Sequence, residues 1–541
     1  MFYSHRRALA VIAASAALAL GAAGCAQTKD NGSGTTSSGA ITTGTTDKVT
    51  SLDPAGSYDN GSFFVMNQIY GFLMNTAPGA TDVTPQPDLA ESASYTTPTT
   101  YTVKLKPGLK FVNGHDLTSS DVKFTFDRMV KINDPNGPAS LLGNLVKTEA
   151  TDATTVVFTL KQANDQIFPQ ILASPAGPIV DEEVFPADKV LADADIVEGH
   201  PFSGQYDISS YSLNQLISFK AWDGYQGSLG NAANSTVNTK YYADASNMKL
   251  DLEQGNIDVA YRSLSATDIA SLRSNDKVAV HEGPGGEIRY IVFNFNTMPF
   301  GATTSDASTA KAQAVRQAMA DLVDRSAIAT NVYKDTYTPL YGYVPSGLKG
   351  AGEQFKTLYG DGNGKPDLDK AKKALSDAGV ATPVTINLQY NPDHYGPSSG
   401  DEYALIKTQL ENGGLFKVNL QSTEWVQYSK DRTNDVYPVY QLGWFPDYSD
   451  PENYLSPFFV KDNFLNNHYD NATVQSLIAK QVSITDTAER EKAILEIQDL
   501  VSKDISTLPL LQGKQFAISG TSVQGVTLDA SFKFRLAPLS K

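Results

Sequence analysis

The chain has 541 residues, of which 41% are hydrophobic and 19% are charged, as in folded globular proteins. This length is too great for one hydrophobic core, so two or three domains are expected. The formal net charge of −16 argues against a nucleic-acid-binding surface, and the single cysteine excludes an internal disulfide.

The N-terminal segment predicts an export signal. The cluster HRR at 5–7 is followed by an apolar run at 8–23 and then by Cys25. Because a membrane-spanning helix needs ~20 apolar residues, we interpret residues 1–24 as a cleaved signal peptide. The cysteine at the cut resembles the bacterial lipobox, although Ala22 stands where that motif usually has leucine. We therefore expect lipidation of Cys25, and the alternative is an ordinary signal peptide with an incidental cysteine.

Residues 26–39 read AQTKDNGSGTTSSG and contain almost no side chain to bury. Segments rich in Gly and Ser behave as flexible coils. We expect residues 25–39 to form a lipidated cysteine and a flexible tether of ~20 Å that holds the folded part clear of the membrane. The alternative is a disordered terminus without that role.

From residue 40 onward, strand-like and helix-like patterns follow one another along the chain. Strand patterns occur at 40–46, 101–106, 154–160, 384–390 and 508–520. Helical spacing with start and stop signals occurs at 61–74, 119–130, 309–333, 366–380, 401–414 and 472–504. Segment 309–333 fits one long helix or a pair, and segment 472–504 fits two helices. These patterns predict a mixed α/β protein with several domains.

Motifs typical of enzymes are absent or incomplete. The sequence has no G-x-x-x-x-G-K-[ST] loop, and its six histidines are scattered without a zinc pattern. Residues 396–400 fit G-x-S-x-G, and Asp447 and His468 follow Ser398 in hydrolase order. However, five residues separate this motif from the preceding strand, and Pro397 precedes the serine. We prefer a helix-capping loop here, with a secreted serine hydrolase that uses Ser398 as a rival hypothesis.

Segment GWFPDYSDPENYL at 443–455 combines aromatic, acidic and proline residues in a loop-like stretch. Its prolines restrain the backbone before and after Asp447. A fixed carboxylate flanked by Trp444 and Tyr448 suits the binding of a cation in a partly dry pocket, because aromatic walls exclude water. The residues alone leave an ordinary surface loop with aromatic packing as the alternative.

Five blocks follow one another in an informative order. The first two span 50–75, which contains Leu52-Asp53-Pro54, and 88–129, which contains Lys106-Pro-Gly108. Later blocks are GNIDVAY at 255–261, VRQAMADLVDRSAI at 315–328 and AKKALSDAGV at 371–380. In this order and spacing the chain resembles the extracellular solute-binding proteins of family 5, the oligopeptide and dipeptide receptors of ABC importers. The resemblance runs from about residue 40 to the C-terminus.

The resemblance implies a periplasmic-binding-protein-like α/β fold (type II, cluster C). It has two lobes, an extra inserted domain and a ligand cleft between the lobes. Domain I is expected from residues 40–80, 200–298 and 505–541, domain II as an insertion at 81–199, and domain III at 299–504. The chain is expected to cross between lobes near Met298 and Ser506, and the cleft to close by hinge rotation.

The resemblance also implies a function without covalent chemistry. The protein is expected to capture peptides outside the cell as a monomer anchored to the outer face of the cell membrane, or in the periplasm if the host has an outer membrane. It would deliver them to a permease with its ATPase subunits. No nucleic acid, cofactor or metal is expected. Because relatives bind oligosaccharides or nickel chelates, another solute is the alternative ligand.

Candidate site residues are carried over from matching positions. In peptide receptors of this family, an aspartate in the segment matching GWFPDYSDP pairs with the peptide's α-ammonium, and that position is Asp447 here. A matching loop that contributes backbone contacts consists of Tyr58, Asp59 and Asn60. Further candidates for pocket walls, each of which could equally belong to the core, are Trp425, Trp444 and Asn294.

One position departs from the pattern of some relatives. Some oligopeptide receptors carry an arginine three residues before the tryptophan of this motif, where this chain has Gln441. The residue that binds a ligand carboxylate is therefore not assigned. The ligand backbone is expected to pair with strand-like segments of the protein, which gives affinity without reading side chains.

Overall fold

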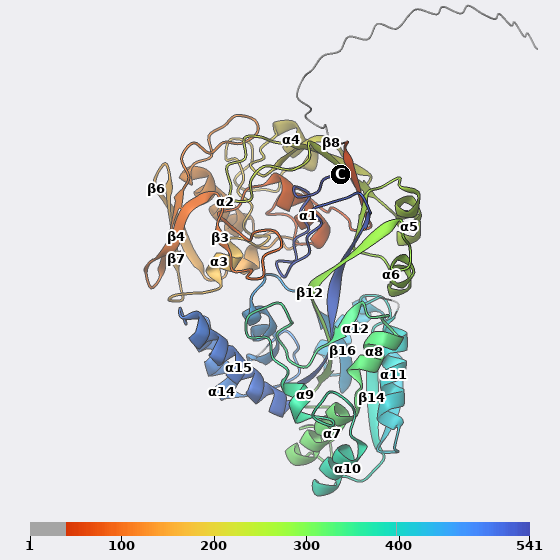
Figure 1. Ribbon diagram of the computed structural model, residues 1–541. Helices are drawn as coiled ribbons and strands as arrows, with labels where there is room; N and C mark the ends of the chain where they lie inside the picture. The colour runs from red at the N-terminus through yellow and green to blue at the C-terminus, as the bar shows by residue number, and fades with distance from the viewer. Residues whose placement is uncertain (1–38, 397, 462) are drawn as a thin grey trace, which may run out of the picture. The chain divides into compact units, whose positions relative to one another are not determined.

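The computed structural model describes residues 39–396, 398–461 and 463–541, and Figure 1 shows how their helices and strands are arranged. The predicted signal peptide, Cys25 and the tether up to residue 38 lie outside the described residues. Within the described residues, no helix combines the length and the apolar character that crossing a bilayer requires.

An eleven-stranded mixed sheet runs through the described chain. Ten strands lie in the order β15-β14-β16-β12-β17-β11-β1-β10-β9-β8, and β13 pairs with β17 beside this path. β1 and β14 pair in parallel with their neighbours, whereas β12 and β17 pair antiparallel. The strands are β1 (Ile41–Thr45), β8 (Tyr206–Ser212), β9 (Leu216–Ala221), β10 (Thr236–Tyr241), β11 (Val259–Tyr261), β12 (Val278–Phe293), β13 (Tyr337–Pro339), β14 (Val384–Tyr390), β15 (Phe416–Ser422), β16 (Val439–Trp444) and β17 (Thr507–Gly520).

The long strands β12 and β17 belong to more than one hydrophobic core. β12 from Ile288 onward and β17 up to Leu511 pack into one core, whereas the opposite ends of both strands pack into others. The intervening segments, 281–287 and 512–515, contribute to none of these cores, and the strand register shifts after Pro284. Both strands therefore lead from one packed lobe into another (Figure 1).

We call residues 39–280 and 516–541 the first lobe and residues 288–511 the second lobe. Helical elements of the first lobe are α1 (Asn60–Ile69), α2 (Ser119–Ile132), η1 (Ala139–Leu142), α3 (Phe168–Ile171), α4 (Asp193–Gly199), α5 (Ala245–Gln254) and α6 (Ala266–Leu272). Those of the second lobe are α7 (Thr309–Leu322), α8 (Arg325–Asn331), α9 (Gln354–Leu358), α10 (Leu368–Asp377), α11 (Ser399–Glu411), α12 (Trp425–Thr433), η2 (Pro451–Tyr454), α13 (Ser456–Phe459), α14 (Ala472–Gln481) and α15 (Thr487–Asp504).

Two smaller sheets lie in the first lobe, one of two strands and one of four. The four-stranded sheet is antiparallel with order β4-β5-β7-β6 and has its own core with α2. Thr118 and Asp121 form a capping box at the start of α2, which satisfies backbone donors that would otherwise be unpaired. The additional strands are β2 (Met74–Asn75), β3 (Gln86–Pro87), β4 (Ala90–Thr97), β5 (Thr100–Leu105), β6 (Leu145–Asp152) and β7 (Thr155–Leu160).

The predicted helices are confirmed, with one marked change of extent. The segment 309–333 forms the pair α7 and α8, the second of its two predicted alternatives, because Asp324 accepts a hydrogen bond from the backbone N–H of Ala327 and starts a new helix. The helix expected at 61–74 ends at Ile69, so its predicted end is wrong. A Cβ at Gly71 would lie 2.5 Å from Leu89 Cδ1, and the chain leaves the helix here to pass closely beside that residue.

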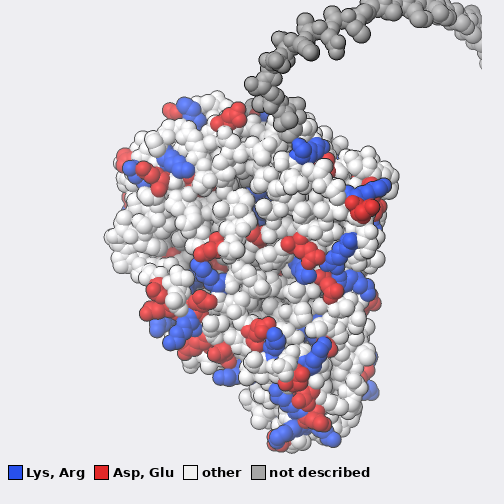
Figure 2. Space-filling view, in the orientation of Figure 1, with Lys and Arg blue, Asp and Glu red and all other residues white. Residues whose placement is uncertain are grey.

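Charged residues of both signs lie interspersed on the face that Figure 2 displays. The net charge of −16 is thus not gathered into one acidic patch on this face of the described residues. A basic stripe that could follow a nucleic-acid backbone is not seen there either.

Candidate functional site

Asp447 is held by a neighbouring asparagine in the segment that follows β16. Its backbone N–H donates to Asn453 Oδ1 at 2.8 Å, and Asn453 Nδ2 donates to Asp447 Oδ2 at 3.0 Å. The indole Nε1 of Trp444 also donates to Asn453 Oδ1, at 3.1 Å. Asn453 therefore fixes both the backbone and the carboxylate of Asp447, while Trp444 orients the asparagine.

Tyr58 of the first lobe contacts Asp447 of the second lobe. The phenol O–H of Tyr58 donates to Asp447 Oδ1, so two predicted site residues 389 positions apart are brought together. Burial, followed by the charge of Asp447 and the hydrogen bond to it, raises the pKa of Tyr58 far above its usual value. The phenol therefore stays protonated and acts as a neutral donor to the carboxylate.

Asp59 and Asn60 form the start of α1. Asp59 is the N-cap, because its Oδ1 accepts from the backbone N–H of Ser62 at 2.8 Å, and such a bond satisfies an otherwise unpaired helix donor. Asn60 is the first residue of the helix and lines a cavity described below. Of the three residues in this predicted loop, Tyr58 is the one whose side chain contacts Asp447.

Trp444 and Trp425 both pack within the second lobe. The ring of Trp444 meets Phe458 edge-on at 5.5 Å between centroids, directly behind the Asp447 segment. Trp425 begins α12 and stacks on His394 at 3.8 Å. Among the described residues, Trp425 does not line either cavity that reaches Asp447.

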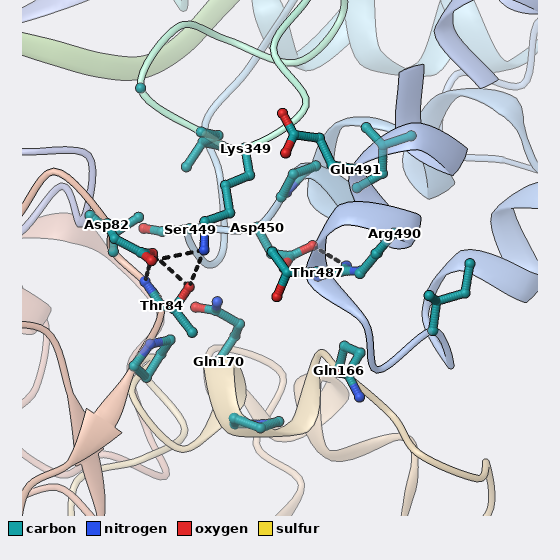
Figure 3. Close-up of a pocket in the computed structure, with 18 of the residues that line it drawn as sticks. Asp82, Thr84, Gln166, Gln170, Lys349, Ser449, Asp450, Thr487, Arg490 and Glu491 are labelled. Atoms are coloured by element: carbon teal, nitrogen blue, oxygen red, sulfur yellow. Dashed lines mark hydrogen bonds and ion pairs between the residues drawn. The ribbon is translucent and has the colours of Figure 1, made fainter. Parts of the chain in front are cut away.

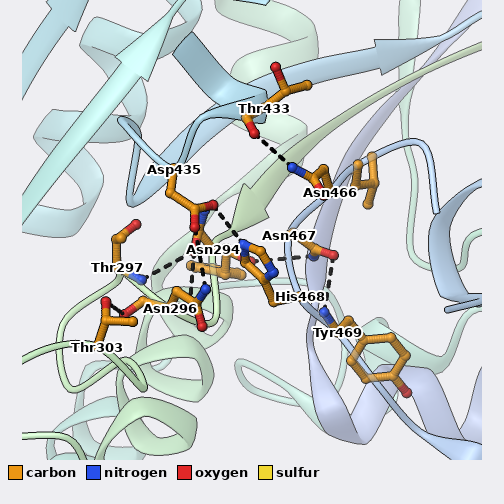
Figure 4. Close-up of polar contacts among 12 residues, drawn as sticks. Asn294, Asn296, Thr297, Thr303, Thr433, Asp435, Asn466, Asn467, His468 and Tyr469 are labelled. Atoms are coloured by element: carbon orange, nitrogen blue, oxygen red, sulfur yellow. Dashed lines mark hydrogen bonds and ion pairs between the residues drawn. The ribbon is translucent and has the colours of Figure 1, made fainter. Parts of the chain in front are cut away.

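Asn294 closes a turn at the end of β12 (Figure 4). Its Nδ2 donates to Asp435 Oδ1 at 2.8 Å, and its Oδ1 accepts from the backbone N–H groups of Asn296 and Thr297. The side chain is fully buried. The structure therefore gives both ends of this amide local partners and does not bring it to Asp447.

The residues of the hydrolase hypothesis are not assembled. His468 Nε2 lies 2.6 Å from Asp435 Oδ1 (Figure 4), whereas Asp447 contacts Tyr58 and Asn453. Ser398 stands at the N-cap position of α11, as the helix-capping interpretation predicted, but its side chain makes no capping hydrogen bond. The nucleophile, base and acid of a triad must form one hydrogen-bonded chain, so the rival hypothesis is wrong.

Two cavities reach Asp447. One of about 340 Å³ lies between the four-stranded-sheet region of the first lobe and residues 447–457, and Asp165 and Glu452 also line it. The other, of about 40 Å³, is shared with Lys533. Burial, and then the positive charge of Arg535, lowers the pKa of Lys533 to about 7. Near neutral pH this amine is only partly charged, which limits its repulsion of a cation at Asp447.

A larger cavity of about 500 Å³ lies beside the segments that join the lobes, and we call it the hinge cavity. The residues that line it include Asn60, Arg262, Gly286, Arg289, Phe445 and Pro446. Gly286 is needed for close approach, because a Cβ at this position would lie 2.4 Å from Pro446 Cγ. Since Phe445 and Pro446 directly precede Asp447, the hinge cavity and the Asp447 carboxylate lie along one short segment.

A second contact between the lobes lies near the other end of this segment (Figure 3). Lys349 Nζ of the second lobe donates to Asp82 Oδ2 at 2.8 Å, and this bond lowers the pKa of Asp82 to about 2. In the same region Arg490 holds Asp450 with two hydrogen bonds of 2.6 and 2.8 Å. Asn453 and Arg490 together fix residues 447–453.

Sequence reasoning missed Asn453, Arg262 and Lys533. Asn453 lies within GWFPDYSDPENYL, and the Asp-Pro start of a short helix after Asp447 was a signal that the chain turns back at this point. No local pattern marks Arg262, which follows β11, or Lys533, which lies in the irregular segment after β17, because packing between distant segments brings them to these cavities. No group of three or more potential metal ligands occurs among the described residues.

Comparison with known proteins agrees with this geometry. The family model for bacterial extracellular solute-binding proteins, family 5 (middle region), matches residues 84–466. Heme-binding protein A of Haemophilus influenzae is 25% identical over 85% of this chain and 84% of that protein. Glutathione-binding protein GsiB of Escherichia coli K12 is 25% identical over 81% of this chain and 83% of that protein.

Solved structures have the same fold. HbpA2 from Haemophilus parasuis has a TM-score of 0.79 at 21% identity, covering 93% of this chain and 99% of that one. DppA from Helicobacter pylori, in complex with the peptide STSA, has a TM-score of 0.70 at 19% identity, covering 93% and 98%. With its two-lobed α/β fold and a family match over most of its length, the chain belongs to the family 5 extracellular solute-binding proteins of ABC transporters, which bind solutes and are not enzymes.

Proposed function

We propose that this protein captures peptides between its two lobes and delivers them to the permease and ATPase subunits of an ABC importer. The observation that carries the proposal is the carboxylate of Asp447 at the boundary of the lobes, in contact with Tyr58 from the opposite side. The comparisons support solute binding for the family, and the step to peptides rests on the chemistry of this carboxylate.

Asp447 favours a ligand with an amine. Asn453 holds the carboxylate in place, and the nearest donor across the cleft is the neutral phenol of Tyr58. A ligand ammonium would form a charge-assisted hydrogen bond, which is roughly twice as strong as a neutral one. A ligand without a cation would leave the carboxylate without a counter-ion when the lobes close, which is unfavourable.

An extended ligand backbone would gain main-chain hydrogen bonds from a strand-like segment of the protein, without its side chains being read. The end of β16 is not free for this role, because residues 441–443 are buried and the carbonyl of Gln441 accepts from the phenol of Tyr428 at 2.7 Å. The ring of Tyr395 also packs on Gly443, where a Cβ would lie 2.8 Å from Tyr395 Cε1. The segment that would pair with the ligand backbone is therefore left unassigned.

We place the hinge at segments 281–287 and 512–515. This choice differs from the expected crossings near Met298 and Ser506, because residues 288–293 pair with β16 of the second lobe. Segments outside the cores can absorb backbone rotation without disturbing packed side chains. The proposed domains otherwise keep residues 81–199 as the inserted domain II.

The relatives named above bind several kinds of ligand, including heme, glutathione and peptides. The proposal is tested by releasing whatever copurifies with the protein from its native host and identifying it by mass spectrometry. Peptides with free N-termini are expected. A single non-peptide solute, such as an oligosaccharide or a metal chelate, would refute the peptide assignment.

We further propose that the protein is a monomer anchored outside the membrane through lipidated Cys25. The Cys25→Ser variant is expected to appear mainly in the medium, or in the soluble periplasmic fraction of a host with an outer membrane, because it lacks the thiol that carries the lipid. Fractionation and immunoblotting check this result, with wild type as the membrane-bound control. Continued membrane retention of the variant would contradict acylation.

A further inference from the structure

The hinge cavity continues from both halves of the Tyr58–Asp447 contact. Phe445 and Pro446 line it just before Asp447, and Asn60 lines it two residues after Tyr58. A ligand whose ammonium lies at Asp447 can therefore extend into this cavity. Charged groups that line this cavity would meet the rest of such a ligand.

Three cationic side chains line the hinge cavity, and two of them are already paired. Arg289 is 4% exposed and lies 3.2 Å from both Glu287 and Glu402. Lys514 Nζ lies 3.1 Å from Glu282. Neither of these groups offers an unpaired positive charge to a ligand.

The third cation, Arg262, is only loosely paired. Its Nε lies 3.5 Å from Asp47 Oδ2, and its side chain is 36% exposed. Its guanidinium makes no hydrogen bond with any described residue, whereas the buried Arg128 forms two bonds of 2.6 and 2.8 Å with Asp53. Since arginine carries five donors in a planar fork, most of the binding capacity of Arg262 is unused.

The backbone at Arg262 has an unfavourable conformation. Arg262 and Ser263 both have φ of +64°, a region that is unfavourable for non-glycine residues and is enriched at ligand-binding sites. The backbone N–H of Arg262 donates to Phe516 O, and its carbonyl accepts from Leu264 at 2.9 Å. These bonds hold the arginine at the cavity wall between β11 and α6.

We propose that Arg262 binds the carboxylate of the ligand at the end opposite Asp447. The inference rests on the proposed peptide-binding function and narrows it: the preferred ligands are peptides with both a free N-terminus and a free C-terminal carboxylate. A guanidinium and a carboxylate form a planar two-bond pair, and Asp47 at 3.5 Å is too distant to have formed that pair already. Arg262 thus fills the role that Gln441 leaves open.

The test compares each peptide as free acid and as C-terminal amide. Pools of random peptides of three, four and five residues are offered to the purified protein, and the peptides retained are identified by mass spectrometry. The best of these is synthesised in both forms, and affinities are measured by calorimetry for wild type, Arg262→Gln and Arg262→Lys. Lys514→Gln tests the rival cation of the same cavity, and Lys277→Gln, at an exposed position of the first lobe, provides a control for loss of one charge outside the cavity.

Wild type is expected to bind the free acid about 10-fold more tightly than the amide, the scale of a hydrogen-bonded ion pair. Arg262→Gln is expected to bind both forms equally, and Arg262→Lys to keep part of the preference. Lys514→Gln is expected to keep the preference, because Lys514 is already paired with Glu282, and Lys277→Gln is expected to discriminate as wild type does. Thermal unfolding checks that each variant is folded.

Two outcomes separate the inference from the function on which it rests. If wild type retains no peptide from any pool, the proposed function fails and the inference fails with it. If wild type binds peptide and Arg262→Gln still prefers the free acid about 10-fold, the role of Arg262 alone is overturned. Loss of the preference in Lys514→Gln but not in Arg262→Gln would assign it to Lys514 instead.

Discussion

Replacing Asp53 with alanine is expected to lower the free energy of unfolding by about 3–5 kcal/mol. Asp53 and Arg128 are 0% and 3% exposed, and they form two hydrogen bonds of 2.8 and 2.6 Å. Asp53 also accepts from the backbone N–H groups of Ala55 and Leu191. Removing the carboxylate leaves a buried guanidinium without its counter-ion, and arginine cannot shed its proton to relieve this.

The same arginine joins three parts of the first lobe. From α2 it reaches Asp53 in the segment before α1, and it also donates to the carbonyls of Pro186 and Lys189. We therefore expect the first lobe of the Asp53→Ala variant to unfold at a lower urea concentration than that of wild type. Urea unfolding followed by circular dichroism measures the change.

Asp127→Ala is the matched control for this prediction. Asp127 lies next to Arg128 on α2 and pairs with the exposed Lys123, each with a side chain nearly half exposed. Exposed pairs of this kind contribute little to stability, so no resolved change is expected. A loss of less than about 1 kcal/mol in Asp53→Ala would contradict the argument for the buried pair.

The sequence predicted those helices and strands whose start, stop and spacing patterns lie within a few neighbouring residues. The capping box of Thr118 and Asp121 marks the start of α2, and the apolar spacing sets its length. β12 was not predicted, although it is the longest strand, because Gly283-Pro-Gly-Gly286 interrupts any strand pattern. Pairing with β17 on both sides of this interruption maintains the strand, and that partner lies over 200 residues away.

The residues of the candidate site also differ in how far the sequence could predict them. Asp447 could be predicted from its own segment, since the surrounding prolines and aromatic residues are adjacent in sequence. Its contact with Tyr58 depends on the approach of two lobes and has no local signal. Asn294 was selected as a possible wall, but its burial in a turn with Asp435 follows from the end of β12 meeting the segment before β16. The partners of Asp447 and Asn294 are thus set by packing between segments that are distant in sequence.

Asp447→Asn is expected to weaken peptide binding by about 2 kcal/mol or more, which is about 30-fold in Kd. The asparagine keeps the size of the side chain, and its Oδ1 can still accept from Asn453 or Tyr58. What it loses is the negative charge that a ligand ammonium requires. Calorimetry with the peptide that wild type retains best measures the change, and thermal unfolding checks the fold of the variant.

Acetylation of the peptide's N-terminus tests the same contact from the ligand side. Wild type is expected to lose about as much affinity for the acetylated peptide as Asp447→Asn loses for the free one. Asp447→Asn should no longer distinguish the two peptides, because the coupled pair is already broken. Asp470→Asn, an exposed change of equal charge in the second lobe, should leave both affinities as in wild type.

Tyr58 competes with the ligand for Asp447. In the structure its phenol donates a hydrogen bond to the carboxylate oxygen that the ligand ammonium would bind, so an incoming ligand must displace a neutral hydrogen bond. Tyr58→Phe removes this competitor and is expected to leave amine binding equal to or tighter than wild type, with discrimination against the acetylated peptide intact. Equal affinities of wild type for the free and acetylated peptides would remove Asp447 from the binding site, whatever its variant does to the fold.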